Sequence, residues 1–269
     1  MQLQIFTIDA FSDRPFGGNP AATVMVAKFP PDGLMQRIAA EMNLSETAFA
    51  CQLDANKFHL RWFTPTQEMP LCGHATLAMA HYLREIGAVA IDQPLTFKTL
   101  SGDLIINFMG KTIEMDFPAQ GLQPIADVAE QALEAIFADL DYECIGFGGD
   151  NYTVVLDAEA LVKDFQPDFE AIAKLDTGRL IITAAAADRP YDFVSRFFAP
   201  GVGINEDPVT GSAHCILTPY WAKRLGKSEL KARQLSARSG DLIVTHRGDR
   251  VKIAGNAITV LRGQIDLPD

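Results

Sequence analysis

Polar and apolar residues alternate along several short segments of the chain, including residues 2–9 and 57–63. This period of two predicts strands with one buried face. Two segments differ, because residues 73–87 and 211–226 are small or apolar at most positions and each begins with glycine. A helix that is apolar on nearly every side is buried on nearly every side. The pattern therefore predicts an α+β protein in which strands surround two buried helices.

The sequence around these two predicted helices is repeated at a constant offset. Gly73 recurs as Gly211, and the five residues at 101–105 recur letter for letter at 239–243, each 138 positions further along. A period this long is not that of a solenoid. The repeat indicates a duplicated chain.

The duplication predicts two lobes related by a pseudo-twofold axis. Residues 118–124, with two prolines and a glycine, are the expected linker between an N-terminal lobe (1–117) and a C-terminal lobe (118–269). We expect each lobe to be a curved sheet wrapped around its central helix. There is no strand–helix–strand alternation and no Gly-x-Gly-x-x-Gly motif, so a nucleotide-binding fold has little support.

Composition and charge limit the kinds of molecule that the protein is expected to bind. The 269 residues carry a formal net charge of −11, which disfavours binding to nucleic acids or to an anionic membrane surface. A small anionic substrate needs only a local positive pocket and stays possible. No segment has the ~20 apolar residues of a membrane span, and the start of the chain does not resemble a signal peptide. The four cysteines show no Cys-x-x-Cys spacing, and this absence is typical of reduced thiols in a cytoplasmic protein. The histidines are scattered along the sequence and predict no metal site.

The two glycine-initiated helices are the first candidates for chemistry. A helix N-terminus presents free backbone N–H groups and about half a positive charge, which suits a carboxylate. A single helix start with these residues could be an ordinary capped N-terminus. Two such starts related by duplication favour a binding site for an anion. The polar residues beside these starts occupy matched positions: His74 matches Ser212, and Cys72 matches Thr210.

Three side chains are candidate acids or bases: Glu46, His74 and Asp207. Asp207 precedes a proline and is therefore held extended, which could aim its carboxylate into a cleft; the alternative is an acid that complements the helix dipole. Glu46 lies in a polar stretch, 43–47, for which a solvated turn is the alternative. A mechanism with two thiol bases is disfavoured, because the partner position of Cys72 is Thr210, whose hydroxyl is too weak an acid.

Six stretches, taken in order, resemble the PhzF-like family, which is named for the phenazine-biosynthesis isomerase and belongs to the wider diaminopimelate-epimerase-like fold. They span most of the chain and comprise residues 9–11, 16–21, 43–49, 61–65, 70–77 and 207–214. The resemblance implies that each lobe is a barrel-like sheet around its central helix and that the active site lies between the lobes. It also implies that Glu46 is the general acid/base. In the family this glutamate moves a proton between carbons of a dihydro-hydroxyanthranilate with no cofactor or metal, and members are often homodimers.

The resemblance also implies substrate-holding roles for further residues. His74, Asp207 and Ser212 match residues that flank the glutamate, and Gly73 and Gly211 match backbone donors. We count Glu46, Asp207 and His74 as catalytic candidates. The expected substrate-binding residues are Gly73, Gly211, Ser212, Thr210, Cys72 and Asn19, the last of which lies in the stretch 16–21.

The sequence thus predicts a cofactor-independent cytoplasmic isomerase, possibly a homodimer, that acts on a small carboxylate. One alternative is an amino-acid racemase or epimerase in which Cys72 acts with the carboxylate of Glu46 or Asp207. The other is a non-catalytic protein of the same fold that binds a small carboxylate or serves as an interaction scaffold.

Overall fold

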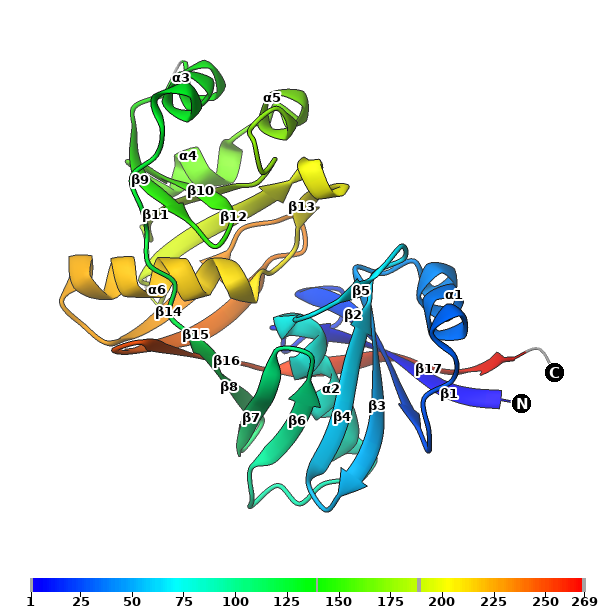
Figure 1. Cartoon of the computed structure of the whole chain (residues 1–269). Coiled ribbons are helices and arrows are strands. Elements are labelled where there is room, and N and C mark those ends of the chain that lie inside the picture. The colour runs from blue at the N-terminus through cyan, green and yellow to red at the C-terminus, as the bar shows by residue number, and fades with distance from the viewer. Residues whose placement is uncertain (1, 139, 188–189, 268–269) are drawn as a thin grey trace. The chain divides into compact units, whose positions relative to one another are not determined.

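The computed structural model describes residues 2–138, 140–187 and 190–267. The chain folds into two compact units: Met1–Asp116 together with Ala254–Asp269, and Phe117–Ile253. Figure 1 shows the elements of both. Within the described residues, every helix is too short or too polar to cross a membrane.

The first unit is built on one mixed sheet. Its strands run in the order β17, β1, β2, β3, β4, β6, β7 and β8, and the short β5 pairs with β4. The β2–β3 and β4–β6 pairs are parallel, and the others are antiparallel. The elements are β1 (Gln2–Ala10), β2 (Asn19–Val26), α1 (Asp32–Met42), β3 (Glu46–Asp54), β4 (Lys57–Phe63), β5 (Glu68–Met69), α2 (Gly73–Glu85), β6 (Leu95–Thr99), β7 (Gly102–Met109), β8 (Thr112–Pro118) and β17 (Ala257–Asp266).

Helix α2 lies at the centre of this unit, in contact with β1, β2, β3 and β17 (Figure 1). Every residue from 74 to 80 is buried, as are Tyr82 and Leu83, so the helix is enclosed on nearly all sides, as its composition predicts. Small residues such as Ala75 and Ala78 let the strands approach closely. The outer face of the sheet carries α1, whose Met35, Ile38 and Ala39 join a separate core cluster with β2 and β3.

The second unit contains the remaining elements. These are α3 (Asp127–Ile136), β9 (Tyr142–Gly148), β10 (Asn151–Leu156), α4 (Glu159–Asp164), α5 (Phe169–Ala173), β11 (Leu180–Ala185), β12 (Phe193–Ala199), the 3-10 turn η1 (Pro200–Val202), β13 (Ile204–Asp207), α6 (Gly211–Leu225), β14 (Glu229–Gln234), β15 (Gly240–Arg247) and β16 (Arg250–Gly255).

Strand pairing in the second unit repeats that of the first. The β9–β10 pair is antiparallel, β10–β11 parallel, β11–β12 and β12–β13 antiparallel, β12–β14 parallel and β14–β15 antiparallel. This is the pairing order of β1 to β7, and α6 follows β13 as α2 follows β5. The predicted α+β fold of two duplicated lobes, each a sheet with a central helix, is confirmed.

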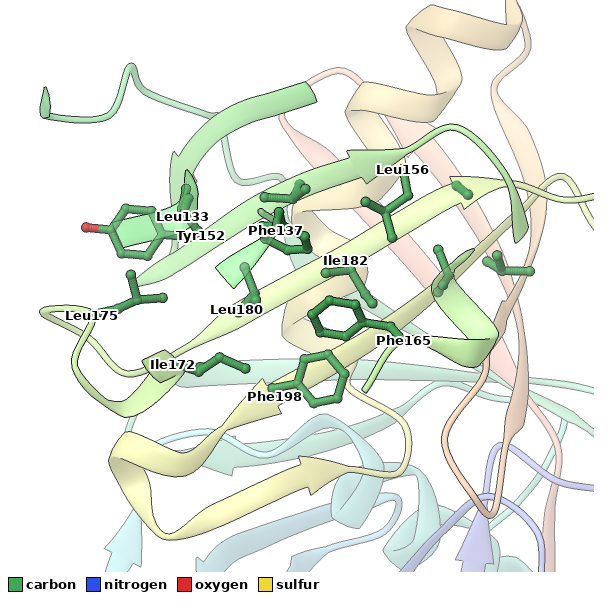
Figure 2. Packing of buried hydrophobic residues seen from close by; sticks show 14 residues of the cluster. Leu133, Phe137, Tyr152, Leu156, Phe165, Ile172, Leu175, Leu180, Ile182 and Phe198 are labelled. Atoms are coloured by element: carbon green, nitrogen blue, oxygen red, sulfur yellow. The ribbon is translucent and has the colours of Figure 1, made fainter. Parts of the chain in front are cut away.

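The core that covers the outer face of the second sheet is aromatic (Figure 2). Phe165, just after α4, stacks on Phe137 with ring centroids 5.3 Å apart and approaches Phe198 on β12 at 5.9 Å. Ile182 and Leu180 on β11 belong to the same cluster. The cluster fixes α3, α4 and α5 on the sheet by burial of apolar surface.

The end of the chain requires a correction to the predicted lobes. The sequence placed residues 254–269 in the C-terminal lobe, but they belong to the first unit. The physical reason is that β17 pairs with the whole of β1, from Gln2 opposite Asp266 to Ala10 opposite Ala257. The duplicated segment ends with β16, the counterpart of β8, so β17 is an additional strand that the repeat could not place.

Candidate active site

The start of α2 brings four of the predicted site residues together: Asn19, Glu46, Cys72 and His74. Asn19 and Glu46 are the first residues of β2 and β3, which are parallel neighbours with Ala21 opposite Glu46. Because the two strands are parallel, their first residues lie side by side at the same end of the strands. The first turn of α2 lies at that end, with His74 as its second residue and Cys72 extended just before it.

A glycine turn delivers Asn19 to this place. Gly18 has a φ of +61°, and a Cβ there would lie 2.0 Å from the carbonyl oxygen of Ala10. Only glycine fits such a close backbone approach. The turn is held further by the buried Asp9, whose Oδ2 accepts a 2.7 Å hydrogen bond from the N–H of Phe16.

His74 is the centre of the cluster. Its Nε2 lies 3.1 Å from Oε2 of Glu46, and the two side chains are only 7% and 11% exposed. On the other side of the ring, Nδ1 lies 3.2 Å from Nδ2 of Asn19 and 3.6 Å from Sγ of Cys72. Among the described residues, neither Nε2 of His74 nor Oε2 of Glu46 has a well-directed hydrogen bond, although the two atoms are in ion-pair contact.

The charges of the cluster follow from its neighbours. Burial opposes a charge on His74, but Cys72 and Glu46 outweigh it and raise the pKa of His74 well above its ordinary value. Burial, followed by the charge of Glu46, raises the pKa of the Cys72 thiol to about 11. The raised pKa of His74 favours a protonated imidazole in contact with Glu46, and the raised pKa of Cys72 favours a neutral thiol. A carboxylate next to a proton donor can accept and return a proton.

The start of α6 holds a second cluster, formed by Asp207, Thr210 and Gln234. Oγ1 of Thr210 donates a 2.5 Å hydrogen bond to Oδ2 of Asp207. Gln234, at the end of β14, accepts from the Thr210 N–H at 2.9 Å and donates to the Asp207 carbonyl at 2.7 Å. All three residues are buried. The carboxylate of Asp207 is thus held by the Thr210 hydroxyl, which accepts a 3.1 Å hydrogen bond from Nε2 of Gln234.

Both helices leave their first N–H groups without a side-chain cap. Neither Cys72 nor Thr210 makes a capping hydrogen bond within the described chain, and each is extended before the first glycine, Gly73 or Gly211. Such an end attracts an anion. Ser212, the second residue of α6, is exposed.

The sequence-predicted residues therefore fall into two groups, one in each unit. Glu46 is buried at the start of a strand, so the alternative of a solvated turn is wrong. Sequence reasoning missed Gln234. The alternation along β14 could have indicated it, because Gln234 lies on the same buried face of the strand as Leu230 and Ala232. A polar side chain on a buried face needs a hydrogen-bond partner.

Comparison with known proteins shows the family of the chain. The sequence profile of the phenazine biosynthesis-like protein family, PhzC-PhzF, matches residues 8–263. The chain belongs to this family. A member from Pseudomonas aeruginosa, named an uncharacterized isomerase, is 46% identical over 270 residues that cover 99% of this chain and 100% of the relative.

Solved structures agree with this assignment. A PhzF-family protein from Enterococcus faecalis is 40% identical, with a TM-score of 0.89 over 99% of this chain and 100% of that chain. A hydroxyproline epimerase from Agrobacterium vitis shares only 10% identity, with a TM-score of 0.62 over 100% of this chain and 93% of that one. That likeness concerns the fold alone. The PhzF-like chain thus has the diaminopimelate-epimerase-like architecture.

Proposed function

We propose that this protein is a cofactor-independent isomerase that moves a proton between two carbons of a small carboxylate substrate. The observation that carries the proposal is the buried contact of 3.1 Å between Glu46 and His74. Membership in the PhzF-like family and the isomerase names of relatives support the reaction class.

Glu46 is the proposed base and acid. Its carboxylate takes a proton from a carbon beside an unsaturated or carboxylate-bearing centre and returns it to another carbon of the same molecule. His74, held protonated by its neighbours, would stabilise the negative charge that develops. The uncapped N–H groups of α2, beginning at Gly73, offer a place for the substrate carboxylate.

The cluster at α6 supplies a second set of proposed functional groups. We assign Asp207 a catalytic or substrate-orienting role from the family resemblance, with Thr210 holding its carboxylate and Gln234 holding its main-chain carbonyl. Gly211 and Ser212 are proposed substrate contacts. The predicted homodimer and cytoplasmic location stay predictions from the sequence.

The test is deuterium incorporation in D₂O, followed by NMR. The panel contains dihydro-hydroxyanthranilate and small amino and cyclic carboxylic acids, and the wild type is compared with Glu46→Gln. We expect incorporation or isomerisation with the wild type and its loss in the variant. Equal exchange by both proteins would show that Glu46 is not the base. If neither protein exchanges or isomerises any compound, ligand-induced thermal shifts on the same panel test the binding-protein alternative.

The racemase alternative has less support from the geometry. It requires Cys72 to act as a base, but burial and Glu46 raise the pKa of that thiol to about 11. A neutral thiol is a poor proton acceptor. Cys72→Ser separates the two mechanisms: the variant should keep most of its exchange activity if Glu46 is the base and lose it if the thiol is.

A further inference from the structure

Three residues of the α2 cluster form a donor set that the proposed reaction does not require as a set. One ligand atom each from Glu46, Cys72 and His74 lie within 4.8 Å of one another, and all three residues are buried. They come from the start of β3, the residue before α2 and its first turn. A carboxylate, a thiol and an imidazole thus converge on one point from a rigid part of the fold.

This combination of sulfur, nitrogen and oxygen is the ligand chemistry of zinc and similar ions. Bond lengths of ~2.0–2.3 Å place the ligands of a tetrahedral zinc ion about 3.4 to 3.8 Å apart. The three donors are within 4.8 Å of one another before any ion has drawn them together. Because Sγ of Cys72 lies beside Nδ1 and Oε2 of Glu46 beside Nε2, a rotation of the His74 ring together with a contraction of about 1 Å would bring the three donors to one ion.

The contacts of His74 indicate which ring nitrogen the ion would use. Nε2 faces Glu46 and has no well-directed hydrogen bond among the described residues. Nδ1 already contacts the amide of Asn19 at 3.2 Å. A metal-bound histidine usually has its second ring nitrogen held by a polar neighbour, which fixes the ring. That neighbour must accept the ring N–H, so Asn19 would have to present its amide oxygen in place of the Nδ2 that now lies 3.2 Å from Nδ1.

We propose that Glu46, Cys72 and His74 bind one thiophilic divalent cation, such as Zn²⁺ or Cd²⁺, through Oε2, Sγ and Nε2. On binding, the S–H bond of Cys72 and the Nε2–H bond of His74 break, both protons pass to the solvent, and metal–sulfur and metal–nitrogen bonds form; no electron is transferred. The bound ion would occupy the carboxylate and the imidazole that we assign to proton transfer. Metal binding should therefore inhibit the isomerase, a consequence that rests on the proposed function.

Titration of the full, reduced, metal-free chain with Cd²⁺ tests the site without any substrate. Cadmium–thiolate bonds absorb in the ultraviolet, so binding through Cys72 gives a signal that saturates at one equivalent. Cys51→Ser is the matched control, because Cys51 is a free thiol in the same unit outside the cluster. We expect the control to behave as the wild type, and Cys72→Ser to lose the signal and bind at least ~100-fold more weakly.

Loss of the signal in Cys72→Ser could also result from misfolding, which circular dichroism would reveal. Two further variants test the site independently of that change. His74→Gln retains all four thiols and should still lose tight binding. Glu46→Gln should keep the thiolate signal and weaken binding by at least ~10-fold. The proposal is overturned if the Cys72→Ser protein retains the signal, if Cys51→Ser abolishes it, or if no binding saturates at one equivalent.

Inhibition is measured separately, by adding Zn²⁺ and then EDTA to the deuterium-exchange assay. Exchange that stops with Zn²⁺ and returns with EDTA supports both proposals. A cadmium signal without exchange activity towards any substrate leaves the metal site standing and counts against the isomerase. Exchange that continues at saturating metal overturns the inhibitory role alone.

Discussion

The starts of α2 and α6 have the same backbone but different chemistry. Each follows an extended residue, Cys72 (φ −147°, ψ 113°) or Thr210 (φ −115°, ψ 104°), and begins with glycine. At α2 the histidine is in the first turn, beside a carboxylate that helps to raise its pKa. At α6 the carboxylate of Asp207 is instead bound by Thr210, next to an amide network.

A second matched position shows how far the side chains have diverged. Thr76 and His214 stand 138 residues apart and make the same contact, with the carbonyl of Cys72 and of Thr210, at 2.5 and 2.7 Å. Burial lowers the pKa of His214 to about 4, so this imidazole is neutral where His74 is charged. Both helix starts keep the same backbone, whereas the buried pair of histidine and carboxylate is found at α2.

The largest contrast is expected from removing each carboxylate in turn. Glu46→Gln should lower the exchange rate by about 10³-fold, because a positioned general base contributes 10²–10⁴-fold. Asp207→Asn, which keeps the hydrogen-bonding shape, should cost less, about 10- to 100-fold. Initial rates of deuterium incorporation measure both. A larger loss in Asp207→Asn would transfer the main proton-transfer role to the second unit.

The neutral histidine predicts a pH dependence of stability. Between pH 6.5 and about 4 the unfolded chain binds a proton that the folded chain excludes at His214, so stability falls as the pH falls. The shift corresponds to roughly 3 kcal/mol over that range. His214→Thr, which copies Thr76, should flatten the curve of unfolding free energy against pH measured in urea. Parallel curves for the two proteins would contradict the assignment.

The cluster at the start of α6 differs from the one at α2 because it is held together by the side-chain amide of Gln234. Gln234→Leu leaves the Thr210 N–H and the Asp207 carbonyl buried without this partner, which should cost about 2 to 3 kcal/mol of unfolding free energy. Urea denaturation measures the loss. Gln234→Glu, which keeps the acceptor for Thr210, should cost less at acidic pH, where it is protonated. A negligible effect of the leucine variant would mean that water replaces the amide.

The smallest contrast concerns two arginine–glutamate ion pairs, one on the strands before α2 and one on the strands before α6. Arg61 binds Glu68 through two bonds of 2.7 Å, and Arg196 binds Glu206 at 2.7 and 3.0 Å. Arg196 also donates to the carbonyls of Val162, Lys163 and Phe165, whereas the additional partner of Arg61 is the exposed Asp32.

Replacing each arginine by lysine removes the bidentate geometry. We expect Arg196→Lys to cost about 2 kcal/mol and Arg61→Lys about 1 kcal/mol, because the buried carbonyls lose their donor only in the former. Thermal and urea unfolding of the two variants give the difference. Equal losses would show that the carboxylate pair alone accounts for the stabilisation.

The sequence predicted the two helix starts because the evidence for them is local and duplicated. The glycines at 73 and 211, the small residues that follow and the constant offset all lie in short segments. The position of Glu46 was different. Residues 43–47 are polar and look solvated, and only the parallel pairing of β2 with β3, two segments separated by α1, buries the side chain beside His74. The family resemblance, and not the local pattern, assigned Glu46 its role.

Gln234 was missed and the last strand, β17, was placed in the wrong lobe for related reasons. The side chain of Gln234 contacts residues 24 and 27 positions away in sequence, so no local pattern reveals its partners. Strand β17 has no counterpart in the repeat, and its pairing with β1 joins opposite ends of the sequence. Contacts between distant segments depend on which edge of a sheet is open, and this is decided only in the folded state.

The pairing of β17 with β1 has a consequence for synthesis of the chain. During translation β1 emerges first, but its outer edge stays open until β17 has been made, roughly 10 to 50 s later at ordinary elongation rates. The second unit, which is continuous in sequence, can complete its sheet before then. The unit that carries Glu46 and His74 is therefore completed only after the second unit has been made, and in the interval one edge of β1 stays open to pairing with other strands.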